Sequence, residues 1–174
     1  APKVTDSGVH YLAPIDTDAG GTWLATNQYG LTVCLLNYYA AAEPDQDDIR
    51  SRGEVVIKLA GSRSIAELET TLHAMPLAFY KGFEIVALQN DVWHWRWDTV
   101  SLSKIDAIQP ITSSSYDTAT VHKKRQDYFK SLGQTDSLET LKHFHSCHLD
   151  DDNHRLAILP DDDSLAVNSV CMHR

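Results

Sequence analysis

The 174 residues have a mass of 19.5 kDa, which is enough for one domain with a sizeable core. Hydrophobic residues make up 43% and charged residues 22%, a composition that excludes a disordered chain. A net charge of −9 would repel a phosphate backbone, so we expect no nucleic-acid partner.

No apolar run approaches the ~20 residues of a transmembrane helix, and neither end resembles a secretory signal. The three cysteines are an odd number and widely spaced, which argues against a disulfide framework and favours a reducing, cytoplasmic setting. The chain opens without Met and stops on "CMHR" directly after an apolar strand pattern. We therefore expect a single domain over residues 1–174 that has been shortened at both ends.

The first elements form a hairpin, with β-rich runs at 22–26 and 31–36 joined by "NQYG". Gly30 suits the positive φ expected at the exit of the turn. Both alternating faces of 31–36 are largely apolar, as expected of a strand covered on two sides. This pattern predicts that Cys34 is buried.

Two short helices follow. The spacing of Ser51 and Glu54 predicts a capping box, and Gly61 a stop. Ser64 and Glu67 repeat the same spacing, and a proline ends the second helix.

An antiparallel section comes next. The run 83–89 turns at Asn90 and Asp91 into 92–98, and 99–108 adds a third strand. Three tryptophans at every second position of 92–98 indicate either a core face beneath helices or a stacking platform for a flat ligand, and we favour the core. The residues between and after them are expected on the opposite face, in cross-strand ion pairs: His94, Arg96 and Asp98.

The last third predicts a helix over 117–132 closed by Gly133, and another from Asp136 to about residue 145, capped through Glu139. A final hairpin pairs 155–159 with 165–172. Strands precede, separate and follow paired helices, so the fold class is α+β with mainly antiparallel pairing.

Two candidate residues lie in the strand 31–36 or directly after it. Cys34 has apolar neighbours that would raise its pKa, which favours an inert core thiol over a nucleophile. Asn37 ends the run, where its amide could polarise a carbonyl or merely terminate the strand.

Two further segments offer chemistry. "HFHSCH" holds His143, His145, Cys147 and His148, but these ligands do not share one helical face, so we expect a solvated helix end and no metal. The serine run that begins at Ser113 could bind an anion or simply cap the helix after it. No nucleotide-binding or metalloprotease motif is present, and we expect no cofactor.

Several stretches together resemble one family: "LAPIDTDAGGTWLATNQYGLTVCLLNYY", "SRGEVV", "ITSSSYDTATVHKKRQDYF" and "SVCMHR". This is the NRDE-motif family, also called transport and Golgi organisation protein 2-like. Its members begin Met-Cys and carry Asn-Arg-Asp-Glu soon afterwards, and neither element occurs in this sequence.

The family is similar to the N-terminal nucleophile hydrolases, an αββα sandwich in which a processed N-terminal Cys attacks an amide. The resemblance implies an amidohydrolase acting on a C–N bond of a small substrate, with this chain inactive because the Cys is missing. Residues expected to line the pocket are Trp23, Asn37, Arg52 and Ser113. The alternatives are a carrier of haem or lipid and a structural interaction domain.

Overall fold

The computed structural model describes residues 2–16, 20–115, 118–133 and 137–146. The chain divides into two compact units, Ala1–Ala107 and Ile108–Arg174. The first unit holds all the strands of the described residues, and the second holds two helices. That the chain is a single domain stays a prediction.

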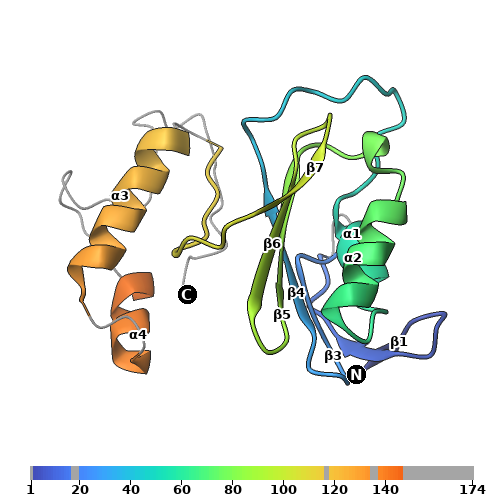
Figure 1. Cartoon of the computed structure of the whole chain (residues 1–174), viewed down its shortest axis with the longest axis horizontal. Helices are drawn as coiled ribbons and strands as arrows, with labels where there is room; N and C mark the ends of the chain where they lie inside the picture. Colours follow the sequence, from blue (N-terminus) through green and yellow to red (C-terminus); the bar gives the residue numbers. More distant parts are fainter. Residues whose placement is uncertain (1, 17–19, 116–117, 134–136, 147–174) are drawn as a thin grey trace. The chain divides into compact units, whose positions relative to one another are not determined.

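The first unit contains one antiparallel sheet of seven strands in sequential order (Figure 1). The strands are β1 (Lys3–Val4), β2 (His10–Leu12), β3 (Leu24–Asn27), β4 (Thr32–Asn37), β5 (Phe83–Leu88), β6 (Val92–Trp97) and β7 (Leu102–Ile105). The predicted α+β class and antiparallel pairing are confirmed. The two short strands β1 and β2 are additional to the predicted ones.

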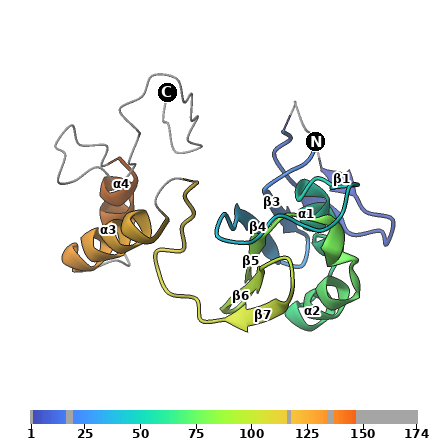
Figure 2. The same ribbon diagram turned by 90° about the horizontal axis from the view of Figure 1, so that it is seen from above.

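One face of this sheet carries the hydrophobic core. Ile85 pairs with Trp95 across β5 and β6, and Val33 pairs with Ala87 across β4 and β5, and all four are buried. Helices α1 (Gly53–Leu59) and α2 (Ile65–Ala74) cover this face (Figure 2). The preference for a core role of the tryptophan stripe is confirmed, since Trp95 is 1% and Trp97 8% exposed.

Of the two capping boxes predicted for the first unit, the second forms its serine bond and the first does not form. Ser64 has extended backbone and accepts a hydrogen bond from the Glu67 amide, as predicted for the start of α2. The N-cap of α1 is instead Arg52, whose side chain makes no capping bond. The Ser51 hydroxyl accepts from the Gly53 amide at 3.3 Å, so the serine lies one position too early for a capping box. A short 3-10 turn, η1 (Leu77–Phe79), leads from α2 to β5.

The start of α1 touches the chain before β3 through two glycines. The Cα atom of Gly53 lies 3.1 Å from the place where a Cβ on Gly21 would be. A Cβ on Gly53 would come within 2.8 Å of the Gly21 Cα and 2.7 Å of the Thr22 nitrogen. Only residues without a side chain allow these two backbones to approach so closely.

The end of α1 is held by a buried amide. Asn27, 6% exposed, donates through Nδ2 to the carbonyls of Ala60 and Ser62 at 3.0 and 2.6 Å. Its Oδ1 accepts from the amides of Tyr29 and Leu31, which closes the β3–β4 turn. Gly30 has a φ of 73°, as predicted for the exit of this turn.

The second unit contains α3 (Thr118–Ser131) and α4 (Leu138–Ser146). Phe129 is buried and meets Phe144 edge-to-face, with 5.1 Å between ring centroids. Both helices are confirmed, and Gly133 follows α3 with a φ of 71°. The Ser137 hydroxyl accepts from the Thr140 amide at the start of α4. The predicted cap Asp136 and the hairpin 155–172 lie outside the described residues. That these helices pack on the sheet stays a prediction.

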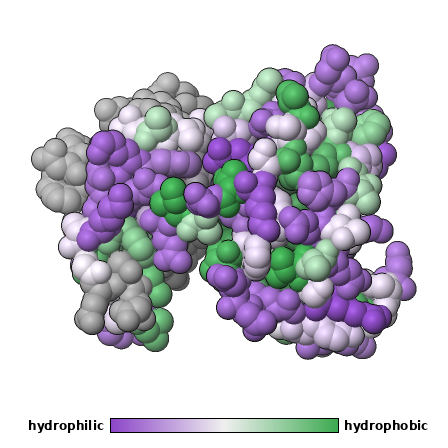
Figure 3. Space-filling view, in the orientation of Figure 1, coloured by the Kyte–Doolittle hydropathy of each residue, from purple (hydrophilic) through white to green (hydrophobic). Residues whose placement is uncertain are grey.

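The molecular face in Figure 3 is largely hydrophilic, with hydrophobic side chains in small separate groups. None of the helices in the described ranges combines the length and apolarity needed to cross a membrane.

We expect Gly53→Ala to lower the free energy of unfolding by ~1–3 kcal/mol, because the added methyl group would collide with backbone atoms that cannot rotate away. Urea unfolding followed by circular dichroism measures this change. Gly61→Ala is the matched control, since its nearest neighbour is the rotatable Ser7 hydroxyl at 3.2 Å. Equal stability of both variants would contradict the close contact.

Candidate functional site

A group of polar residues gathers where β4 ends, β5 begins and α1 starts. We call it the strand-end cluster, and it consists of Asn37, Tyr39, Arg52 and Gly82. Asn37 is the last residue of β4 and pairs with Phe83, the first residue of β5. The contact between Gly21 and Gly53 brings the start of α1 to the chain segment that leads into β3, the strand beside β4.

Hydrogen bonds connect the cluster in two pairs. Asn37 donates through Nδ2 to the Tyr39 hydroxyl at 2.8 Å. Arg52 donates through Nη1 to the Gly82 carbonyl at 3.0 Å, and the Tyr38 amide donates to the same oxygen at 3.1 Å. A side chain on Gly82 would come within 2.7 Å of the Tyr38 carbonyl oxygen. Glycine at this position therefore allows the carbonyl to receive both donors.

Arg52 is a half-buried cation whose counter-charge is distant. Burial lowers the pKa of its guanidinium, while the attraction of Tyr39 and Glu43 raises it. Glu43 forms an exposed ion pair with Lys81 at 2.8 Å and is not within ion-pairing distance of Arg52. Among the described residues, the one acceptor of the Arg52 guanidinium is a backbone carbonyl.

Two further residues are predicted to line a pocket. Trp23 precedes β3, is 41% exposed, and its carbonyl accepts from the Leu35 amide at 2.8 Å. Ser113 belongs to the second unit, where its carbonyl accepts from Arg125 Nη1 at 2.9 Å. A binding role for any of the four predicted residues stays a prediction.

Cys34 points away from this cluster. It alternates with Val33 and Leu35 along β4, so its side chain lies on the sheet face opposite to that of Asn37. Three residues of strand add about 10 Å between the two positions. The prediction of a buried thiol is wrong in degree, because Cys34 is half-buried on the face that α1 and α2 leave uncovered. Burial still raises the pKa of the thiol, as expected of an unreactive cysteine.

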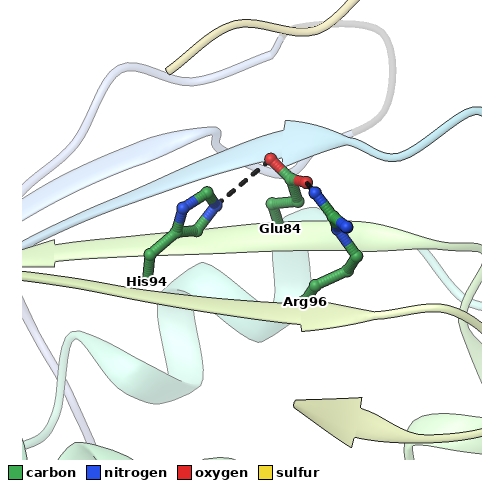
Figure 4. Close-up of polar contacts among 3 residues, drawn as sticks. All are labelled: Glu84, His94 and Arg96. Atoms are coloured by element: carbon green, nitrogen blue, oxygen red, sulfur yellow. Dashed lines mark hydrogen bonds and ion pairs between the residues drawn. The ribbon is translucent and has the colours of Figure 1, made fainter. Parts of the chain in front are cut away.

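The same face, opposite to α1 and α2, carries a triad of two buried residues, Glu84 and His94, and the half-buried Arg96 (Figure 4). Glu84 Oε2 lies 3.2 Å from His94 Nε2, and Glu84 Oε1 lies 2.7 Å from Arg96 Nη2. Arg96 also stacks on Tyr38, with 4.5 Å to the ring centroid. The predicted cross-strand ion pairing of His94 and Arg96 is confirmed.

Asp98, the third residue expected in cross-strand ion pairs, binds backbone amides instead. Its Oδ1 accepts from the amides of Val100 and Ser101 at 2.9 and 2.7 Å, which shapes the turn between β6 and β7.

The triad keeps Glu84 ionised in a buried place. Burial raises the pKa of this carboxyl, but the hydrogen bonds and charges of His94 and Arg96 outweigh burial and hold the pKa below its usual value. Glu84 itself was not a sequence candidate. The sequence does carry a signal for it: Glu84 is the one charged residue of the apolar run "FEIVAL", and the strand that follows carries His94 and Arg96 at alternate positions.

The predicted metal-free helix end is described in part. His143 lies in α4, and its Nε2 is 3.2 Å from the Tyr128 hydroxyl of α3. Cys147 and His148 lie outside the described residues, and the side chain of His145 does as well. The absence of a bound metal therefore stays a prediction.

We expect Glu84→Gln to cost ~3 kcal/mol of stability at pH 7, because it leaves the half-buried Arg96 guanidinium and the buried His94 ring without their carboxylate. The depressed pKa stabilises the folded state above the unfolded value of about 4.5, and this contribution is lost as pH falls through the lower folded pKa. Denaturant unfolding at pH 7 and below pH 4.5 should show the two proteins converging at low pH.

The exposed Glu43→Gln is the control for this series and should change stability by less than ~1 kcal/mol. A difference between Glu84→Gln and the original protein that stays constant with pH would contradict the role assigned to the triad.

The sequence matches the Transport and Golgi organisation 2 family over residues 2–158. No curated protein matches it. The family match covers most of the chain and includes every strand, both helices of the first unit and both helices of the second. The chain therefore belongs to the Transport and Golgi organisation 2 family.

Proposed function

We propose that this domain binds a small amide at the strand-end cluster, and that it is the scaffold of an amidohydrolase with the αββα architecture of the N-terminal nucleophile hydrolases. The observation that carries the proposal is the position of Asn37 at the end of β4: the next residue, Tyr38, donates its amide to the Gly82 carbonyl, which also accepts from the Arg52 guanidinium. The proposed setting is the cytoplasm and the proposed ligand is a small molecule.

Asn37 has the chemistry that amide hydrolysis needs. An amide N–H placed at a fixed point stabilises the negative charge that develops on a carbonyl oxygen under attack. One N–H of Asn37 is directed at the Tyr39 hydroxyl, which fixes the plane of the side chain. The second N–H has no protein acceptor among the described residues, and the side chain is half-buried. It is available to a substrate carbonyl.

The nucleophile is the part of the proposal that comes from the family resemblance. It would be a processed N-terminal Cys, whose own α-amine takes the thiol proton. Cys34 lies on the opposite face of the sheet from Asn37. The competing proposals, a carrier and a structural interaction domain, need no nucleophile.

We expect amide hydrolysis by a form of the protein whose mature N-terminus is Cys, and none by the matched form in which that Cys is changed to Ser. Release of the amine from N-hexanoylglycine, followed by mass spectrometry, compares the two. Turnover by the 174-residue chain that persists in a variant with all three cysteines changed to Ser would contradict the proposal. Binding without turnover in a gene product that carries the Cys would favour the carrier.

Asn37→Ala in the active gene product should lower kcat by about 10²–10³-fold, as loss of one oxyanion donor does elsewhere. Asn90→Ala is the matched control, because Asn90 is an exposed amide in the β5–β6 turn. Equal loss in both variants, or no loss in Asn37→Ala, would remove Asn37 from the reaction.

A further inference from the structure

Within the described ranges, Arg52 is a half-buried cation that pairs with no carboxylate. It is half-buried, and burial destabilises its charge. Two other half-buried guanidinium groups are described. That of Arg96 has the carboxylate of Glu84 at 2.7 Å, and that of Arg125 donates to both the Thr112 hydroxyl and the Ser113 carbonyl. Arg52 has a single backbone carbonyl at 3.0 Å.

The single contact also fixes how the guanidinium is presented. Nη1 is held by the Gly82 carbonyl, and that carbonyl is held in turn by the Tyr38 amide. The remaining edge of the guanidinium, formed by Nε and Nη2, has no acceptor within the described residues. Two parallel N–H groups on that edge match the two oxygens of a carboxylate. An arginine held in this way is a preformed anion receptor, whereas a lysine would supply only a point charge.

The nearest protein acid is a poor competitor for this edge. Glu43 attracts Arg52 from a distance, but it is paired with Lys81 at 2.8 Å and its side chain is 78% exposed. An exposed pair of this kind contributes little and exchanges readily. A ligand carboxylate that enters the cluster therefore meets a cation that no protein carboxylate neutralises at contact distance.

We propose that Arg52 binds the carboxylate of the substrate, so that the substrate class is N-acylated amino acids. This inference rests on the proposed amide-binding function. In this arrangement Asn37 donates to the amide carbonyl and Arg52 binds the carboxylate, so the two residues bind the two polar groups of one small molecule. An N-acyl amino acid has these two groups separated by a single carbon atom and the amide nitrogen.

The test uses two probes that differ only in charge, N-hexanoylglycine and its neutral twin N-hexanoylglycinamide. Isothermal titration calorimetry with the 174-residue chain should show that N-hexanoylglycine binds at least ~10-fold more tightly than N-hexanoylglycinamide. Arg52→Gln should reduce the affinity for the acid to that for the amide. Arg50→Gln is the matched control. Arg50 lies two residues before Arg52 and is exposed, so this variant loses the same charge but should keep the preference for N-hexanoylglycine.

A second variant guards against misfolding of Arg52→Gln. Arg52→Lys keeps the charge and a donor for the Gly82 carbonyl but lacks the paired N–H edge of a guanidinium. It should therefore bind N-hexanoylglycine about 3-fold more weakly than the original protein while still preferring it to N-hexanoylglycinamide. Thermal unfolding without ligand checks that the variants are folded.

The outcomes separate the two proposals. If both probes bind equally well and Asn37→Ala weakens both, the carboxylate assignment is overturned while the amide site stands. If neither probe binds, the amide site fails and the assignment to Arg52 fails with it. Displacement of N-hexanoylglycine by equimolar inorganic phosphate would show a general anion site and overturn the assignment to N-acylated amino acids.

Discussion

The contact between the backbones of Gly21 and Gly53 is the constraint on which the strand-end cluster depends. It lets the start of α1 lie directly against the chain that enters β3, with no side chain between them. Arg52 is adjacent to this contact in sequence, so its guanidinium reaches the Gly82 carbonyl at the start of β5. At the other end of α1, Asn27 binds the carbonyls of Ala60 and Ser62. Fixed at both ends, the helix holds Arg52 in one place relative to the sheet.

The charges of Glu84 and Arg52 differ in how completely other residues of the chain pair with them. Glu84 lies on the sheet face opposite to α1 and α2, where its carboxylate pairs with the Arg96 guanidinium and hydrogen-bonds to the His94 ring, so we assign it a structural role. Arg52 lies at the end of the sheet with one neutral acceptor. A buried charge with complete pairing stabilises a particular fold, whereas a half-buried charge with incomplete pairing remains available to a ligand. This difference is why we place binding at the strand ends and not at the triad.

Sequence patterns predicted the helices and strands that have a strong periodicity. They failed where one residue determines the start of a helix or a long-range contact. The alternating tryptophans of β6 identified the core face, because burial on one side of a sheet imposes a period of two. Strands β1 and β2 are only two and three residues long, too short to show any period. The spacing at Ser51 imitates a capping box, yet the helix begins two residues later, at Gly53, where the glycine contact allows it to start. Asn27 resembles an ordinary turn residue. Its hydrogen bond to Ala60 at the end of α1 joins positions 33 residues apart, and no local sequence pattern predicts such a contact.

The strictly sequential order of the seven strands has a consequence for synthesis of the protein. Each new strand pairs with the one that left the ribosome before it. The longest interval, between β4 and β5, is filled by α1, which packs on β3 and β4, and by α2, which packs on α1. Pairing between sequence neighbours keeps the entropy cost of loop closure low and favours fast folding. The first unit can therefore assemble from its N-terminal end while the second unit is still being translated, and each growing edge is exposed only until the next strand arrives.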